Sequence, residues 1–480
     1  MNIHIIPLAI LIAYMILTVG IATLALRRTM SSERYLVAGR TLSTGVVLGI
    51  LVGTYLGGGS VIGVTQRSYN EGIVGWIYTL SISLGAFIFA FIMAKRYRRF
   101  SLTTIPEVFN RLFDTKTRVM SLVLLIVAYV FIAMTGVIGG GALLSPLLGV
   151  DKWVADLITT AIFVAIIAVG GLPSIAVVNI VQVVVLYVML IFGLVYSLTL
   201  IGGSVASGWG ALFSELPPSY WSFASIEPLT LSGEIIAVAV TALVAASTVA
   251  TMFAAKDEKA AFRGVLWTGV CLLPIGLVCA LIGMCAKVYF GDTLPYGLSA
   301  GPAMMLALPP VLSGIALCGF WAAIVSTTPI ILIAITQMMT RDIYQAFINR
   351  RASDKEVLLY SRVAAVVLGI VVWAMGIALH HVIELIVIGA ALRVGLAVAL
   401  LVAVYMGARY VSEDGAFWGI IVGFITLIGW GVAGSPYEIH MAIPALITSF
   451  ISIIIISKFR KRKVEFSPET KEALHPGKGY

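Results

Sequence analysis

The chain has 480 residues, of which 60% are apolar and only 11% are charged. An ordinary soluble domain carries roughly 25% charged residues, so this composition excludes a soluble protein and predicts a membrane protein. Polar breaks between the apolar stretches are short, and we therefore expect one membrane domain over 1–457, without a fused kinase or catalytic module. The tail at 458–480 is charged and contains Pro and Gly, and we expect it to be cytoplasmic and disordered.

Apolar stretches long enough to cross a bilayer follow one another almost end to end. A spanning helix needs about 20 mainly apolar residues. The first stretch, 5–26, has no basic residue before it and is too long for the core of a signal peptide, so we interpret it as a retained helix. The pattern predicts about thirteen transmembrane helices, at 5–26, 42–66, 73–94, 119–145, 154–170, 174–200, 233–254, 264–289, 311–337, 357–379, 382–406, 415–433 and 439–457.

The basic residues gather on one side of these spans. If the N-terminus is outside, only three of the 31 basic residues lie outside, Arg67, Lys152 and Lys287, while Arg393 lies within a span. This asymmetry satisfies the positive-inside rule. It predicts a multi-pass protein of the cell membrane with an outside N-terminus and a cytoplasmic C-terminus. The lipid bilayer then accounts for the net charge of +9, and neither a nucleic acid nor an obligate protein partner is indicated.

Two of the predicted spans contain residues that disturb a helix. The first is 42–66, where the run 53–60 (GTYLGGGS) holds three consecutive glycines. Transporters use unwound segments to offer carbonyl groups to cations near the midplane, but close packing of two helices explains the same glycines equally well. The second is 311–337, where the run 322–329 (AAIVSTTP) sets a proline beside three hydroxyls. Such oxygens suit a small cation, although hydroxyls that bond back to their own helix are the commoner case.

Six segments, taken in order, resemble the sodium/solute symporter family, which includes sodium-coupled carriers of proline, pantothenate, monocarboxylates, sialic acid and sugars. Each segment alone is weakly specific, whereas the ordered set runs through nearly the whole chain. The segments are 35–40 (YLVAGR), 59–63 (GSVIG), 104–108 (TIPEV), 170–182, 254–257 (AAKD), and 325–327 followed by 342–344.

The resemblance implies an all-α, leucine-transporter-like fold. In that fold two inverted repeats of five helices, here 42–200 and 233–406, follow one leading helix and precede two trailing helices. The resemblance also implies where Na⁺, the coupling ion, binds. Its ligands are expected to be the carbonyl oxygens of Gly53, Leu56 and Ala323 and the hydroxyls of Ser326 and Thr327.

Two positions depart from the pattern of the family. Many members have an aspartate at the position of Asn179, tied to a second sodium site or to gating. An amide keeps an acceptor oxygen but loses the charge, so we expect one sodium ion per cycle and assign Asn179 and Thr328 to gating or to a lost second ion site. Tyr55 stands where other members often have Asn or Asp, and we place it with Ser60 at the solute site.

Arg393 is the basic residue within a predicted span. It follows His381 by 12 residues, which places it roughly 18 Å deep. A charge at that depth marks a functional site by default, and the planar guanidinium fits a carboxylate. We expect Arg393 to bind an anionic group of the solute, in a stretch that the resemblance implies to be flexible and that is expected to bend at Gly395. A pair with Glu384 or another helix, or a structural arginine bonded to carbonyls, remains the alternative.

Other polar residues near the outer boundary receive simpler interpretations. We expect Glu384 to be a solvated vestibule residue, His380 and His381 to be interfacial, and Asp156 to be hydrated. The long outside loop at 202–232 is rich in Trp, Tyr and Pro, as in an interfacial aromatic belt. A partial gate over the solute path is the alternative for this loop.

These observations predict sodium-driven import of a small organic solute by alternating access. A carboxylate of the monocarboxylate type is the first expectation, with a proline-like amino acid, pantothenate or a sugar as alternatives. An intramembrane enzyme is disfavoured because the chain has neither a nucleophile elbow nor an HExxH motif. A channel, or a nutrient sensor without transport, shares the fold and stays open.

Overall fold

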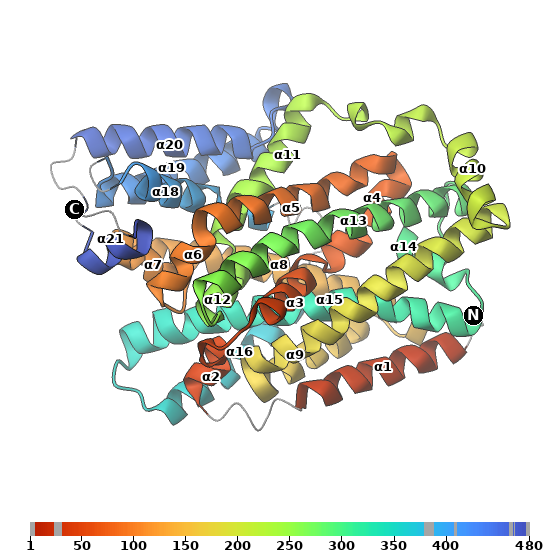
Figure 1. Ribbon diagram of the computed structural model, residues 1–480, viewed down its shortest axis with the longest axis horizontal. Coiled ribbons are helices and arrows are strands. Elements are labelled where there is room, and N and C mark those ends of the chain that lie inside the picture. The colour runs from red at the N-terminus through yellow and green to blue at the C-terminus, as the bar shows by residue number, and fades with distance from the viewer. Residues whose placement is uncertain are drawn as a thin grey trace.

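The computed structural model describes residues 5–23, 31–378, 388–407, 410–459, 464 and 466–476. These residues form a bundle of long helices that run roughly parallel to one another (Figure 1). The helices are α1 (Ile5–Thr23), α2 (Ser32–Val37), α3 (Thr44–Tyr55), α4 (Val64–Glu71), α5 (Ile77–Phe89), α6 (Lys95–Phe100), α7 (Ile105–Leu112), α8 (Thr115–Leu148), α9 (Lys152–Gly202), α10 (Val205–Glu215), α11 (Pro228–Thr241), α12 (Ala246–Ala254), α13 (Glu258–Phe290), α14 (Ala300–Leu306), α15 (Pro310–Met338), α16 (Asp354–Ala378), α18 (Val394–Tyr405), α19 (Glu413–Val432), α20 (Ala442–Phe459) and α21 (Pro468–Leu474).

The predicted spans correspond to the observed helices. Within the described ranges, 11 helical segments are long and apolar enough to cross a membrane. One of them, α9, contains two predicted spans, and the predicted span 42–66 is divided between the shorter α3 and the segment Gly59–Phe100. The two chain ends lie at opposite ends of the bundle (Figure 1), as an odd number of crossings requires.

The boundary between the two spans inside α9 lies at a glycine. Gly171 has φ 56° and ψ −144°, a conformation that only glycine adopts without strain, and Pro173 follows it. A Cβ atom on Gly171 would lie 2.4 Å from the carbonyl oxygen of Tyr35. The chain can therefore turn here while the segment containing α2 packs directly against it.

The span 233–254, predicted to be one continuous helix, is interrupted in the structure. Helix α11 ends at Thr241, a 3₁₀ turn follows over Ala242–Val244, and Ala245 is extended with φ −74° and ψ 103° before α12 begins. The prediction of a continuous helix was wrong because alanine, rather than glycine or proline, occupies the break.

Helix α15 corrects a second expectation. The sequence predicted irregular backbone around Pro329, but α15 is helical from Pro310 to Met338 and is almost entirely buried. Irregular backbone begins only afterwards, in the π-helical segment Met339–Ile348. A single proline removes one N–H donor, and the dense packing around this central helix keeps the rest of it regular.

The end of the chain also differs from expectation. We predicted a disordered tail, but α21 packs its Thr470, Ala473 and Leu474 side chains into the protein. Nε of Arg96 in α6 donates to the carbonyl oxygen of Leu474 at 2.9 Å, and Arg111 of α7 forms an ion pair with Glu469. The described part of the tail is therefore docked on α6 and α7.

Candidate functional site

Helix α3 ends inside the bundle at the predicted run of glycines. Helical geometry stops at Leu56, with φ −89° and ψ 46°, and resumes in a π-helical turn at Gly59–Gly63 that leads into α4. A Cβ atom on Gly57 would lie 2.1 Å from Oγ1 of Thr327. The unwound segment is thus confirmed, and the same glycines also allow the close approach of α15 that was the alternative explanation.

Four of the five predicted cation ligands converge between α3 and α15. The hydroxyl of Ser326 donates to the carbonyl oxygens of Gly53 (2.8 Å) and Ala323 (3.0 Å). The hydroxyl of Thr327 lies 3.0 Å from the Gly53 oxygen and 3.3 Å from the Ala323 oxygen. This compact cluster of uncharged oxygens is the kind of site in which transporters hold a monovalent cation.

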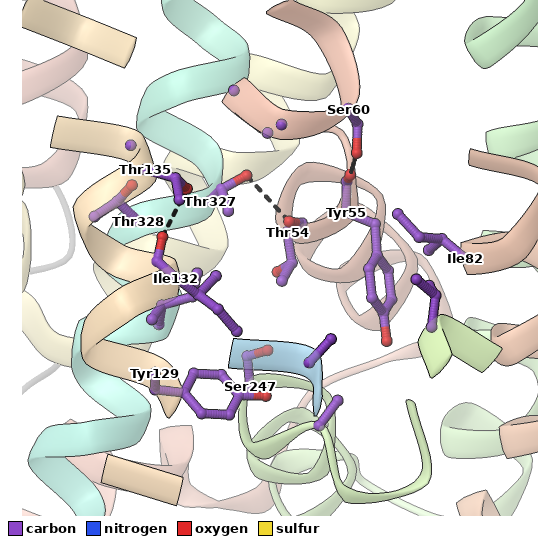
Figure 2. Close-up of a pocket in the computed structure, with 18 of the residues that line it drawn as sticks. Thr54, Tyr55, Ser60, Ile82, Tyr129, Ile132, Thr135, Ser247, Thr327 and Thr328 are labelled. Carbon is purple, nitrogen blue, oxygen red and sulfur yellow. Dashed lines mark hydrogen bonds between the residues drawn. The ribbon is translucent and has the colours of Figure 1, made fainter. Parts of the chain in front are cut away.

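The backbone of the break supplies further oxygens. The carbonyl oxygen of Thr54 accepts a hydrogen bond from Thr327 at 3.0 Å (Figure 2), a contact that the sequence did not predict. Leu56, the fifth predicted ligand, is fully buried at the end of α3, and its carbonyl stays a prediction.

Asn179 lies behind this cluster on α9, fully buried. Its Nδ2 atom donates to the carbonyl oxygen of Ser326 at 2.9 Å and to that of Ile50 at 3.3 Å. The residue that the sequence singled out therefore contacts the predicted cation ligand Ser326 through its N–H groups.

The break in α3 faces the break between α11 and α12. The hydroxyls of Tyr55 and Thr248 lie 2.7 Å apart and connect the two breaks, while the hydroxyl of Ser60 donates to the carbonyl oxygen of Tyr55. Side chains and free backbone groups of two interrupted helices are thus brought together in the middle of the bundle.

A cavity of about 110 Å³ opens between the two breaks. It brings together Tyr55, Ser60, Thr328 and Arg393, and Thr327 borders both this cavity and the cation site. Figure 2 shows Tyr55 of α3 and the neighbouring residues Thr327 and Thr328 of α15 converging on the cavity. Every residue predicted for the solute site therefore lies at one cavity.

Other lining residues were missed by the sequence analysis. Tyr78 of α5 and Tyr129 of α8 are single polar aromatic residues in apolar spans, and nothing local distinguishes them from interfacial tyrosines. Thr241 and Ser247 flank the unpredicted break in the second interrupted helix. The hydroxyl run 247–248, directly after a pair of alanines, was the available signal.

Arg393 lies in a turn that precedes α18, with 8% of its surface exposed. Nε donates to the carbonyl oxygen of Gly389 at 3.0 Å, one terminal nitrogen donates to the hydroxyl of Tyr129 at 3.3 Å, and the guanidinium stands 5.4 Å from the centre of the Tyr129 ring. A turn at Leu392–Arg393 interrupts the helix just before α18, while Gly395, where the bend was expected, is helical and packs against the backbone of Ile420.

The structure tests the prediction for Asp156, and the other polar residues named with it are not described. Asp156 is buried and paired with Lys152 at 2.8 Å, so the expectation of a hydrated residue was wrong. The ion pair with Lys152, four residues earlier in the first turn of α9, and the approach of α8 at Gly141 account for its burial. His380, His381 and Glu384 lie outside the described residues.

A second cavity of about 90 Å³ adjoins the first, and Tyr78 lines both. At its wall Arg67 donates to Glu234 (2.9 and 3.3 Å) and to Glu71 (2.9 Å). Burial lowers the pKa of His440 in the same wall, against the opposing effect of Glu234, which favours the neutral imidazole. Two carboxylates therefore outnumber one guanidinium, a balance that attracts cations.

The sequence pattern of the Sodium:solute symporter family matches residues 35–423. The chain belongs to this family. Among curated proteins it resembles the osmoregulated proline transporter OpuE of Bacillus subtilis, with 25% identity over 95% of each chain. It also resembles the sodium/proline symporter of Escherichia coli, with 24% identity over 92% of this chain and 90% of the relative.

Solved structures of other transporters share the fold of this sodium:solute symporter. A substrate-bound, outward-open Na⁺-coupled sialic acid symporter matches with a TM-score of 0.83 and 14% identity, over 96% of this chain and 99% of the other. Mhp1, a nucleobase-cation-symport-1 family transporter, matches with a TM-score of 0.62 and 15% identity, over 92% and 97%. The predicted leucine-transporter-like fold is confirmed, while the exact limits of the two repeats stay a prediction.

Membership in the sodium:solute symporter family establishes the class of function. The chain is a multi-pass membrane protein that carries a small solute with Na⁺ as the coupling ion, and it is a transporter rather than an enzyme.

Proposed function

We propose that this symporter imports a small solute bearing a carboxylate, together with one sodium ion per cycle, and that proline or a close analogue is the solute. The sequence alone favoured a monocarboxylate. The similarity to relatives named as proline transporters supports the amino acid instead. Arg393 carries the proposal, because its guanidinium lines the cavity that borders the cation site.

The contacts of Arg393 favour a solute carboxylate as its partner. Nε and one terminal nitrogen are occupied by Gly389 and Tyr129, whereas the other terminal nitrogen has no hydrogen bond to a described residue. No acidic side chain pairs with Arg393 within the described ranges. A buried guanidinium with an unused donor is a strong site for a carboxylate.

An amino group also has favourable surroundings in this cavity. The described lining residues include no Asp or Glu. Instead, α3 ends at Tyr55 and the 3₁₀ turn ends at Val244, and carbonyl oxygens at such helix ends carry partial negative charge. The ammonium of a zwitterion would lie near these oxygens, with Tyr55 and Ser60 beside it.

The proposed cycle is alternating access across the cell membrane, with the N-terminus outside and the C-terminus in the cytoplasm. Sodium binds from outside between α3 and α15, the solute binds in the adjoining cavity, and both leave inside. Inward movement of one positive charge gains about 2.3 kcal/mol per 100 mV of membrane potential. A zwitterion with one Na⁺ moves one net charge, whereas a monoanion with one Na⁺ moves none.

Uptake into proteoliposomes under an imposed sodium gradient tests this proposal. We expect proline to accumulate faster with sodium than with a potassium or proton gradient, and faster still with a negative interior. Uptake that ignores the membrane potential would favour a monocarboxylate instead. If no candidate among amino acids, monocarboxylates, pantothenate and sugars accumulates preferentially with sodium, the proposal is wrong.

Arg393→Gln tests the carboxylate contact. Loss of a charged hydrogen bond predicts a rise of about tenfold or more in the solute concentration for half-maximal uptake. Sodium-induced thermal stabilisation of the purified protein should stay unchanged, and Arg393→Lys should give an intermediate affinity. A loss of sodium stabilisation with normal solute affinity would remove Arg393 from the solute site.

A further inference from the structure

The residues around α21 form a docked segment, described at 464 and 466–476, where the sequence predicted a free tail. Helix α21 lies beside α6 and α7 (Figure 1). The backbone N–H of Val464 donates to the carbonyl oxygen of Val411, just before α19, at 3.1 Å. The side chains that the segment buries are those of Val464, Phe466, Thr470, Ala473 and Leu474. The segment therefore packs against several helices at one end of the bundle.

Arg96 of α6 is the residue at which these contacts meet. Its Nε atom donates to the carbonyl oxygen of Leu474 at 2.9 Å, and one terminal nitrogen donates to the carbonyl oxygen of Ile92. The same guanidinium stands 5.7 Å from the centre of the ring of Tyr405, the last residue of α18. One side chain thus contacts the docked segment, its own helix and the end of α18.

Ile92 lies at an irregular point of its helix. Helix α5 passes into α6 through the π-helical segment Ala90–Ala94, and the backbone on either side of it is α-helical. Short π-helical turns inside α-helices frequently occur at functional sites, and helix kinks are often found at them. The docked segment is therefore bound next to the place where the helix formed by α5 and α6 bends most easily.

Both helices that meet at Arg96 begin at the solute cavity. Tyr78 and Ile82 of α5 line this cavity, as does Arg393 at the start of α18. Arg96 follows Ile82 by 14 residues. Tyr405 follows Arg393 by 12 residues. Each helix thus runs roughly 20 Å from the cavity to Arg96. In an alternating-access cycle the solute leaves when the inner parts of the helices around it separate, and a contact that joins two of their ends opposes that separation.

We propose that the docked segment is a latch that holds the inner ends of α6 and α18 together through Arg96, and that its release allows the cavity to open toward the cytoplasm. The inference rests on the alternating-access cycle proposed above and adds a regulatory contact to it. The contacts suit a latch that is released and formed again. The side chain of Glu469, which pairs with Arg111, is 79% exposed, and exposed ion pairs are weak.

Hydrogen–deuterium exchange of the full-length protein in lipid nanodiscs, with sodium and without solute, tests the latch. Leu474→Asp places a carboxylate at a buried position and should undock α21. Exchange should then rise several-fold at 468–474 and also at 92–96 and 400–405, because both helix ends lose a constraint. Unchanged exchange at the two helix ends, with or without a rise at 468–474, would overturn the proposal.

Glu469→Arg and Glu472→Arg form a matched pair of variants on α21. Glu469 pairs with Arg111, whereas Glu472 is exposed and forms no ion pair with a described residue. Glu469→Arg should raise exchange at both helix ends by about 2–5-fold, because the pair is replaced by a modest repulsion. Glu472→Arg should match wild type, and combining Arg111→Glu with Glu469→Arg should restore wild-type exchange. Equal effects of Glu469→Arg and Glu472→Arg would overturn the proposal, since the charge of the segment alone would then explain them.

Sodium-driven proline uptake into proteoliposomes gives the functional readout. Leu474→Asp should raise the maximal uptake rate, because the inward opening no longer has to break the latch. An unchanged or lower rate, together with wild-type exchange across α15, would show a folded transporter that the latch does not restrain, and the inference would be wrong. If wild type does not carry proline, the proposed solute is wrong, while the exchange measurements still decide whether the docked segment holds the two helix ends.

Discussion

The cation site and the solute cavity are neighbours, but they are built in opposite ways. Around the cation site, the hydroxyls of Ser326 and Thr327 both donate to backbone carbonyl oxygens, so the ligands are already held at short distances from one another. In the proposed solute cavity, the hydroxyl of Thr328 has no partner among the described residues, and one terminal nitrogen of Arg393 makes no hydrogen bond to a described residue. The proposed ion site is therefore already compact, whereas the proposed solute cavity contains a buried hydroxyl that no described residue pairs with.

The origin of the residues differs in the same way. The cation site comes from α3 and α15, with α9 behind it, so two short stretches of sequence define nearly all of it. The cavity draws on α3, α5, α8, both parts of the second interrupted helix, α15 and the turn at Arg393. A change of solute needs only a few side chains on several helices, while a change of ion would require the backbone to move.

The substitution Gly57→Ala should have the largest effect, because it acts on both regions. Its new methyl group would collide with Oγ1 of Thr327, 2.1 Å away, and push α15 from the break. Overpacking of this kind costs about 1–3 kcal/mol, which predicts loss of sodium-induced stabilisation and of sodium-dependent uptake. The measurements are thermal unfolding with and without sodium, and uptake into proteoliposomes.

Gly58→Ala is the matched control for that substitution. It makes the same chemical change one residue later, where the nearest atoms to a Cβ lie 3.9 Å away. It should keep most of the sodium response. Equal losses in Gly57→Ala and Gly58→Ala would show that glycine flexibility matters at the break and that the close approach of α15 does not.

Tyr55→Phe should have an intermediate effect that is confined to the cavity. The change removes the 2.7 Å contact with Thr248 that connects the two interrupted helices. A neutral hydrogen bond contributes about 0.5–1.5 kcal/mol, so we expect solute affinity to fall by about 2–10-fold with sodium affinity nearly unchanged. Thr248→Val should have the same effect, and the double variant should be little worse than either single one, because both remove one shared bond. Additive losses would argue against that contact.

The sequence predicted the cation site better than the cavity for a physical reason. The glycines at 57–59 and the hydroxyls 326–328 beside Pro329 marked two stretches that could disturb a helix, and the family resemblance turned them into a predicted set of ligands. Arg393 stood out because a charge in a span is costly. The break at Ala245 had no such signal, because alanine is common in helices and becomes extended here only through tertiary packing.

The fold shows the same division between local and tertiary information. Composition and hydropathy were sufficient to locate most of the long apolar helices, since the bilayer sets the length of each apolar stretch. They did not show that α15 stays helical past Pro329, that Asp156 is buried beside Lys152, or that α21 docks on α6. Each of these depends on neighbours that are distant in the sequence, or on a short polar segment that packs against a surface.

Thr328→Val should have the smallest effect. It tests most directly whether the cavity, unlike the proposed cation site, contains an unpaired hydroxyl. The substitution keeps the shape of the side chain and removes a buried hydroxyl without a described partner. Replacing an unpaired polar group by an apolar one relieves a penalty of about 1–3 kcal/mol, so thermal stability should stay the same or rise. Solute affinity should fall a few-fold if that hydroxyl pairs only with the solute, and sodium affinity should not change.

Thr135→Val supplies the contrast for Thr328→Val within the same cavity. Thr135 already donates to the carbonyl oxygen of Ile132 at 2.7 Å, so its loss should bring no gain in stability and little change in solute affinity (Figure 2). If Thr328→Val instead lowers stability and leaves solute binding intact, its hydroxyl has a structural partner and the cavity is as preorganised as the cation site. A Thr328→Val variant that is more stable but binds solute less tightly would show that the Thr328 hydroxyl is unpaired in the empty cavity and forms a hydrogen bond to the solute.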